Sequence, residues 1–454
     1  MKAAGVMSSW LAALGDAMAR HAKPIQAVQW TMVVVYLVLV AWPAFLPVPD
    51  DSRHIWDNLV LFAQFAFWGV WWPFVMVSML VMGRAWCGVF CPEGTMTEWA
   101  SRHGLGRSIP AWLRWKGWPF VAFVCTTVYG QLITVYEYPK AALLILGAST
   151  VMALGIGLVY GRGRRVWCRY LCPASGVFSL LSRLAPVHFR VDPEQWRLSP
   201  RQPAVNCPPL IDVRRVTGGG SCQMCGRCGG HRGAVTLAAR PPGAEIASLP
   251  SREVSAWDIV LLLFGVMGVA TGAFQWSGAA FFIALKQRLA TLLIDHGMSA
   301  LMSQGLPWWL LTNAPETGEF FSLLDGFCIL ATIAAYALLI GGIGLAGLAA
   351  AARLAGKDVS PWRLGYALVP AGAMGLVIGL SSMTLTQLRA EGLVFAWVPV
   401  ARIGLLALGA GWSGLLLWWS LPPVALPRKV SAWLSGMVAV PVHAGIWLLF
   451  LFGG

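Results

Sequence analysis

Charged side chains are scarce in this chain of 454 residues. Asp, Glu, Lys and Arg together make up 11% of it, less than half of the roughly 25% usual in soluble domains, while hydrophobic residues make up 57%. This composition excludes an ordinary soluble domain. Apolar stretches close to 20 residues long recur along the chain, as crossing a bilayer core of roughly 30 Å requires. The sequence therefore predicts an integral membrane protein.

Acidic residues and histidines are the scarcest polar types. There are 19 Asp and Glu against 33 Lys and Arg, a formal net charge of +14, and only seven His. A haem held between two histidines is not supported, because only His443 falls clearly inside an apolar stretch. The Lys and Arg residues gather in a few loops between apolar spans, the pattern of cytoplasmic loops. We therefore interpret the net positive charge as a sign of membrane topology, with the basic loops on the cytoplasmic side, and expect no nucleic-acid partner.

We predict an all-α polytopic membrane protein of about nine transmembrane helices with a small cytoplasmic ferredoxin-like insert. The expected spans lie near residues 28–47, 58–82, 118–136, 141–160, 257–275, 321–350, 364–386, 395–420 and 431–452. The expected segments are a cytoplasmic amphipathic segment (1–27), a four-helix membrane domain (28–182), the insert (183–256) and a second membrane domain of about five helices (257–454).

The insert contains the motif that decides the prediction of function. Cys222, Cys225 and Cys228 have the C-x2-C-x2-C spacing of bacterial ferredoxins, and Cys207-Pro208 lies where the fourth ligand of a [4Fe–4S] cluster belongs. The ligands of the other cluster of a two-cluster ferredoxin are missing, since Arg197, Pro200, Pro203 and Arg232 stand in their places. We therefore expect a degenerate ferredoxin with one cluster. A structural zinc site built from the same four thiolates is the alternative.

The first membrane domain contains an internal repeat. Trp86-Cys87 with Cys91-Pro92 matches Trp167-Cys168 with Cys172-Pro173, so each copy reads W-C-x3-C-P. A C-x3-C spacing puts two sulfurs on one face of a helical turn. Together Cys87, Cys91, Cys168 and Cys172 could hold a second [4Fe–4S] cluster or another metal, act as a thiol–disulfide relay, or only preserve packing. A static disulfide is disfavoured by the reducing cytosol.

Weaker candidates lie in the membrane blocks. Gly342, Gly344 and Gly347 fit G-x-G-x-x-G, but they lie within an apolar span, which favours helix packing over nucleotide binding. Cys125 and Cys328 lie singly inside spans and are interpreted as packing residues. Ionisable residues inside a membrane are candidates for function. Asp325, Arg402 and His443, with Arg389 and Glu391 near the outer edge, could line a quinone pocket, dock a partner or pair structurally.

The paired C-x3-C-P segments followed by ferredoxin-type cysteines resemble the NapH/NosR-like membrane polyferredoxins over about residues 28–235. The resemblance implies electron transfer in a bacterial inner membrane, between the quinone pool or a cytosolic donor and a reductase system. The residues that match the family's paired motifs are Cys87, Cys91, Cys168 and Cys172. Those that match one of its ferredoxin clusters are Cys207, Cys222, Cys225 and Cys228. The chain departs from the family by lacking one ferredoxin cluster and a large N-terminal flavin-binding domain, and by carrying an additional membrane block.

The expected function is one-electron transfer through iron–sulfur clusters to or from quinone or a redox partner subunit. Two other classes remain open. One is a copper reductase for metalloenzyme assembly, because such reductases also join C-x3-C-P motifs to ferredoxin cysteines. The other is an anchoring subunit of a redox complex in which the cluster only stabilises the loop.

Overall fold

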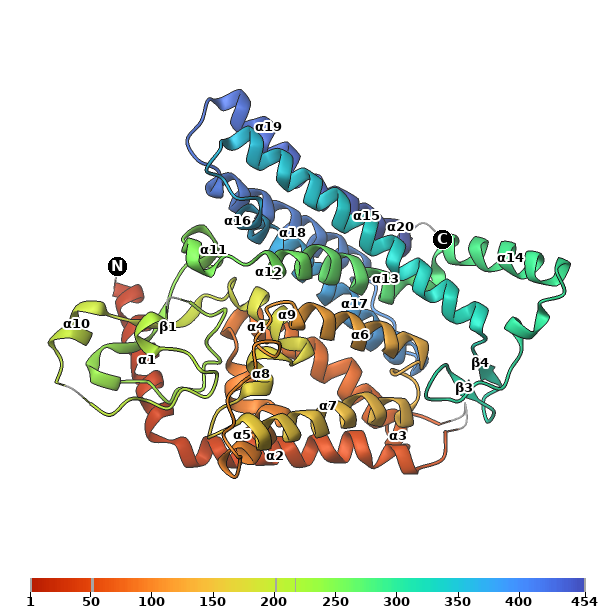
Figure 1. The fold of residues 1–454 in the computed structure, drawn as a ribbon, viewed down its shortest axis with the longest axis horizontal. Coiled ribbons are helices and arrows are strands. Elements are labelled where there is room, and N and C mark those ends of the chain that lie inside the picture. The colour runs from red at the N-terminus through yellow and green to blue at the C-terminus, as the bar shows by residue number, and fades with distance from the viewer. Residues whose placement is uncertain (1, 50–52, 201, 217, 453–454) are drawn as a thin grey trace. The chain divides into compact units, whose positions relative to one another are not determined.

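A computed structural model describes residues 2–49, 53–200, 202–216 and 218–452, and most of them are helical (Figure 1). Within these ranges, eight helices are long and apolar enough to cross a membrane. These candidate spans are Ala22–Phe45, Leu59–Met82, Pro139–Tyr160, Ala256–Gly278, Leu323–Ala355, Pro361–Ala390, Val398–Ser420 and Leu426–Phe452. The structure thus fits the multi-pass helical membrane protein predicted from the sequence.

The expected span at 118–136 differs from the others. It forms α6 (Trp118–Leu132), whose 15 residues fall short of the roughly 20 needed to cross a bilayer. The helix ends where Thr134 adopts a left-handed conformation, with φ of 48°, and the Val135 N–H donates to the Gly130 carbonyl at 2.9 Å. A ninth span therefore stays a prediction.

The chain forms two compact units that are interleaved in sequence. Unit 1 contains Met1–Val38, Phe74–Pro119 and Ala148–Pro250, and unit 2 contains Leu39–Pro73, Phe120–Gly147 and Ser251–Gly454. Four helices pass from one unit into the other: α2 (Ala22–Ala41), α4 (Trp72–Met82), α6 and α7 (Pro139–Tyr160).

Unit 1 is built from short helices and one small sheet. Its remaining elements are α1 (Lys2–Arg20), η3 (Trp86–Phe90), α5 (Pro92–Arg102), α8 (Val166–Tyr170), α9 (Pro173–Ser182), β1 (Val187–Val191), α10 (Pro193–Leu198), η4 (Val213–Arg215), η5 (His231–Gly233), β2 (Val235–Ala239) and α11 (Ala244–Ala247). The antiparallel pair β1–β2, in register from Val187 opposite Ala239 to Val191 opposite Val235, closes the ends of the long loop between them.

Helix α1 packs on this sheet. Leu11 of α1 joins a buried cluster with Phe189 of β1 and Leu237 of β2. A Cβ on Gly15 would lie 2.9 Å from the Leu237 Cβ, so the helix approaches the strand closely. Trp10 remains 63% exposed. Only part of the apolar face expected for a membrane-surface helix is thus used in protein packing.

Unit 2 is a helical bundle centred on α15 (Leu323–Ala355). Its other elements are η1 (Pro43–Phe45), α3 (Leu59–Gln64), η2 (Phe65–Trp71), η6 (Ser251–Glu253), α12 (Ala256–Val260), η7 (Leu261–Val269), α13 (Ala270–Gln275), η8 (Trp276–Gly278), α14 (Ala280–Asp295), η9 (Ser299–Met302), β3 (Asn313–Ala314), β4 (Glu319–Phe320), α16 (Pro361–Gly365), η10 (Tyr366–Leu368), α17 (Val369–Ala390), α18 (Val398–Ser420), α19 (Leu426–Met437) and α20 (Ala439–Phe452). A reciprocal capping pair, Ser322 with Asp325, begins α15, which runs beside η7 and α19 (Figure 1).

Two glycines of the G-x-G-x-x-G stretch lie at helix contacts. A Cβ on Gly347 would lie 2.4 Å from the Ser435 carbonyl oxygen of α19, and one on Gly344 would lie 2.8 Å from the Leu263 side chain. A Cβ on Gly342 would meet nothing within 4 Å. These contacts are those of small residues that let membrane helices approach each other, as the sequence predicted.

We expect Gly347→Ala to destabilise unit 2, because the new methyl group would collide with a backbone oxygen that cannot move alone. Overpacking of this kind costs about 1–3 kcal/mol of unfolding free energy. The measurement is the thermal unfolding midpoint of the detergent-solubilised protein. Gly342→Ala is the matched control, and an equal drop in both variants would contradict the packing role.

Candidate functional site

The first W-C-x3-C-P copy lies where a π-helical turn meets a new helix. Cys87 lies in η3, and Cys91 caps α5 with Pro92 in the first turn. Proline suits this position because the first N–H groups of a helix have no partner within it. The Cys91 N–H donates to the Trp86 carbonyl at 2.9 Å, and the Gly94 N–H donates to the Cys91 sulfur at 3.4 Å. The turn thus fixes the second cysteine against the buried tryptophan.

The second copy repeats this geometry. Cys168 lies in α8, and Cys172 caps α9 with Pro173 in the first turn. The Cys172 N–H donates to the Trp167 carbonyl at 3.0 Å, which is the bond found in the first copy. The sequence repeat is therefore also a structural repeat.

The sulfurs of Cys87, Cys91, Cys168 and Cys172, here called the paired-motif set, share a buried environment. Burial raises the pKa of the Cys168 thiol to about 12, and negative charge on Cys87 adds to the effect. Burial also raises the pKa values of Cys91 and Cys172. Negative charge on Cys168 and Cys87 raises both values further, and charge on Cys91 also raises the pKa of Cys172. Thiols that influence one another in this way lie close together. Removing their protons requires a compensating positive charge or a metal.

The ferredoxin-type cysteines, here called the loop set, lie on the loop that β1 and β2 close. Cys207 is followed by a turn in which Leu210 has φ of 56°, and the 222–228 segment contains Met224 at 49° and Gly226 at 76°. The Met224 N–H donates to the Cys222 sulfur at 3.4 Å. Left-handed residues turn the backbone sharply, which lets a short segment wrap around a small volume.

Burial also acts on the loop set. It raises the pKa of the Cys207 thiol to about 11 and that of Cys228 to about 12, and it raises the pKa of Cys222 further. Charge on Cys225 raises all three values. The loop set is therefore a second group of neighbouring, partly buried thiols.

All ten cysteines of the chain have free thiols. Among the residues that the structure describes, no three His, Cys, Asp or Glu side chains converge so that they could hold a single metal ion. A four-thiolate zinc site needs sulfurs about 2.3 Å from one centre. A [4Fe–4S] cluster instead gives each thiolate an iron of its own, so its sulfurs are spread around a cube.

The two sets adjoin within unit 1. A Cβ on Gly88 would lie 2.2 Å from the Gln223 carbonyl oxygen and 2.6 Å from the Cys225 backbone nitrogen. The turn that carries Cys87 therefore lies directly against the loop that carries Cys225. The Gln29 side chain donates to the Gly88 carbonyl at 2.8 Å, which fixes the other side of this turn.

A buried carboxylate ties these segments together. Glu98 of α5 is 4% exposed and accepts from Arg165 at 2.9 Å, Arg102 at 3.2 Å and Arg227 at 2.5 Å. Burial would raise the pKa of Glu98, but Arg165 and Arg227 hold it below its usual value. The Glu98–Arg165 pair is therefore held out of water, while Arg227 and Arg102 are partly exposed. Sequence analysis missed Glu98, because a single acidic residue in a basic segment carries no motif.

Most ionisable candidates of the membrane blocks have local partners within unit 2. Asp325 caps α15 and pairs with Lys286 at 2.5 Å, and Glu391 pairs with His54 at 2.9 Å. Arg402 donates to Ser382 at 2.9 Å. His443 lies 3.2 Å from Thr271 and accepts from Trp447 at 3.2 Å. These contacts favour the structural alternative over a shared quinone pocket.

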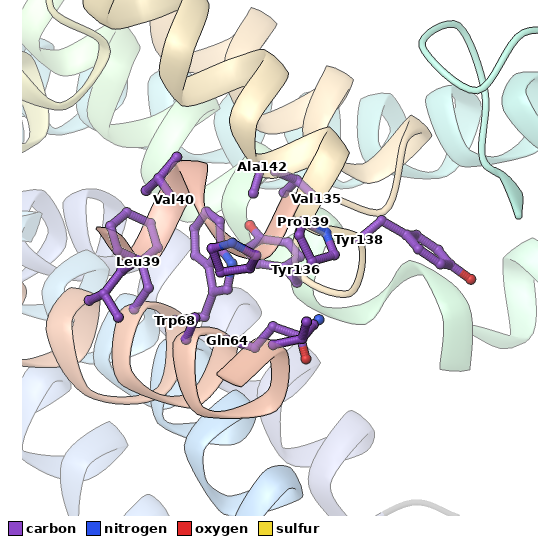
Figure 2. Close-up of a pocket in the computed structure, with 13 residues that line it drawn as sticks. Leu39, Val40, Gln64, Trp68, Val135, Tyr136, Tyr138, Pro139 and Ala142 are labelled. Atoms are coloured by element: carbon purple, nitrogen blue, oxygen red, sulfur yellow. The ribbon is translucent and has the colours of Figure 1, made fainter. Parts of the chain in front are cut away.

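Figure 2 shows a cavity of unit 2 lined by Gln64, Trp68 and Tyr136 among others, next to the π-helical η2. Its volume of about 20 Å³ leaves room for about one water molecule. A larger recess of about 540 Å³ is lined by residues 43–48, 138–141 and 312–316, with Ile133 and Trp308. The recess has the volume usual for an organic ligand, and the cavity in Figure 2 does not.

Comparison with known proteins points to iron–sulfur chemistry. A family model described as a 4Fe-4S binding domain matches residues 64–116 and 145–191, which include the paired-motif set. The chain is 25% identical over 234 residues to the Escherichia coli (strain K12) protein named "Putative electron transport protein YccM". The alignment covers 45% of this chain and 64% of that protein. No solved structure matches. The similarities are thus to a 4Fe-4S binding domain and to a protein named for electron transport.

We expect Gly88→Ala to lower the iron content of the purified protein, because its methyl group would collide with the backbone at Gln223 and Cys225. Iron and acid-labile sulfide per chain are the measurements. Gly155→Ala in α7 is the control, since a Cβ there would meet nothing within 4 Å. Full iron content in Gly88→Ala would show that the close approach is not needed to hold the cofactor.

Proposed function

We propose that this protein is a membrane-bound electron-transfer protein with two [4Fe–4S] clusters. One is held by Cys207, Cys222, Cys225 and Cys228, and the other by Cys87, Cys91, Cys168 and Cys172. Electrons pass between them and exchange with a redox partner or with quinone. The observation that carries the proposal is that two groups of four cysteines adjoin at Gly88 and Cys225, and that burial raises the thiol pKa of three cysteines in each group.

The thiol chemistry of both sets supports this proposal. Burial raises the thiol pKa values, so thiolates at these positions need compensating positive charge, which iron ligation would supply. Cationic side chains already act on both sets: Arg165 and Arg84 on Cys168, and Arg227 and Arg169 on Cys207. Sites of this charge are suited to a negatively charged thiolate cluster.

A [4Fe–4S] cluster supplies reversible one-electron transfer at a potential set by local charge, hydrogen bonds to sulfur and solvent exposure. The chain supplies the rest. Trp86 and Trp167, 7% and 3% exposed, shield the paired-motif set from water. Leu11 and Phe189 pack beside the loop set. The protein thereby controls both the potential and the access of other molecules to each site.

The proposed location is a bacterial inner membrane, with the insert on the cytoplasmic side. The Arg and Lys residues that flank both W-C-x3-C-P copies support this orientation. The resemblance to NapH/NosR-like polyferredoxins suggests a reductase system as partner and quinone as the lipid-soluble carrier. The recess of about 540 Å³ in unit 2 is the cavity with a suitable volume for such a carrier.

Iron counting tests the proposal. The protein should contain about eight irons and eight sulfides per chain, four for each cluster. Cys225→Ser and Cys168→Ser should each lose about half of the iron, because each removes one ligand of a different site. After reduction, each variant should retain the paramagnetic signal of the cluster that the other has lost.

Cys125→Ser is the matched control, since Cys125 is a free thiol that lies in α6 outside both sets. It should keep the full iron content. Wild-type protein without iron and sulfide would overturn the proposal. Equal loss of iron in all three variants would contradict the assignment of ligands.

A further inference from the structure

Arg165 is one of the most deeply buried charged residues of unit 1. It lies three residues before Cys168, at the start of α8, and is 1% exposed. Its backbone N–H donates to the Pro208 carbonyl at 2.7 Å, next to Cys207 of the loop set. Backbone and side chain of one residue therefore reach both cysteine sets.

The guanidinium lies at the contact between the sets. Its Nη1 donates to the Cys87 carbonyl at 2.6 Å and, at 3.4 Å, to the Gln223 side chain. Cys87 belongs to the paired-motif set, while Gln223 lies between Cys222 and Cys225 of the loop set. The Nε atom donates to Glu98 at 2.9 Å.

The remaining nitrogen of this guanidinium is unpaired. Nη2 of Arg165 is buried and has no hydrogen-bond partner, although an unmet buried donor is costly. The atoms that this guanidinium does contact, the Cys87 carbonyl and the Gln223 side chain, belong to the turn and the loop that carry the two cysteine sets.

We propose that Arg165 is a positioning and counter-charge residue shared by the two cysteine sets, so that charge at one site affects the other through a common environment. This inference rests on the proposed function, since it concerns the clusters proposed for these sets. Each one-electron reduction adds one negative charge to a site, and Arg165 keeps its positive charge throughout. The electron comes from the redox partner or, in the experiment, from a chemical reductant.

Charge changes at this residue should move both reduction potentials in a direction fixed by electrostatics. Arg165→Gln removes a positive charge that favours the reduced state, so both potentials should become more negative. Glu98→Gln removes a negative charge and should shift them the opposite way. The expected size is at least a tenfold change in the ratio of reduced to oxidised protein at a fixed potential, or about 59 mV for one electron.

The experiment is a redox titration of full-length protein in detergent, followed by the paramagnetic signals of the two clusters. Arg165→Lys, which keeps the charge, should largely restore the wild-type potentials. Arg183→Gln is the matched control for loss of a buried arginine, because Arg183 pairs with Glu245 at 2.9 Å instead. It should leave both potentials near their wild-type values.

Two results would overturn the inference while leaving the proposed function intact. One is a full iron content in Arg165→Gln with only one potential shifted, or neither. The other is a shift in the same direction in Arg165→Gln and Glu98→Gln, which general loosening of the fold would produce. Wild-type protein without iron would instead overturn the proposed function itself.

Discussion

The arrangement of unit 1 depends on the ion pairs that the carboxylate of Glu98 forms. It lies on the helix that follows one cysteine motif and pairs with an arginine beside another motif and with an arginine of the ferredoxin-type loop. Buried ion pairs gain little net stability, but loss of one partner typically costs 3–5 kcal/mol because a charge is left buried alone. The network therefore joins α5, the segment before Cys168 and the ferredoxin-type loop without adding much net stability.

The same physical constraint governs the cysteines. Six of the eight thiols in the two sets lie in surroundings that penalise negative charge, since burial raises their pKa values. Such surroundings favour the binding of a cationic metal centre, because its positive charge compensates the negative charge of the thiolates. Low solvent access and fixed positive side chains are also what set the potential of an iron–sulfur centre. Burial, ligation and redox tuning thus follow from one feature of the fold.

The sequence predicted the helical spans well, because apolar stretches of about 20 residues have few alternatives in a membrane. It could not predict that α6 ends early, since that depends on a left-handed turn at Thr134. Spacing alone divided the cysteines into two sets. That the two sets adjoin could not be predicted, because Gly88 and Cys225 are distant in the chain. The two residues approach each other closely because Gly88 has no side chain. The role of Arg165 could not be predicted either, because its pairing with Glu98 is a tertiary contact.

The duplicated turn also bears on how the protein matures. Each copy supplies only two of the four sulfurs, and α6 and α7 separate the copies along the chain. A nascent polypeptide that has emerged only as far as Tyr160 would possess half a coordination sphere. The cluster proposed for the paired-motif set could therefore form only after Cys172 has been synthesised and the two copies have met.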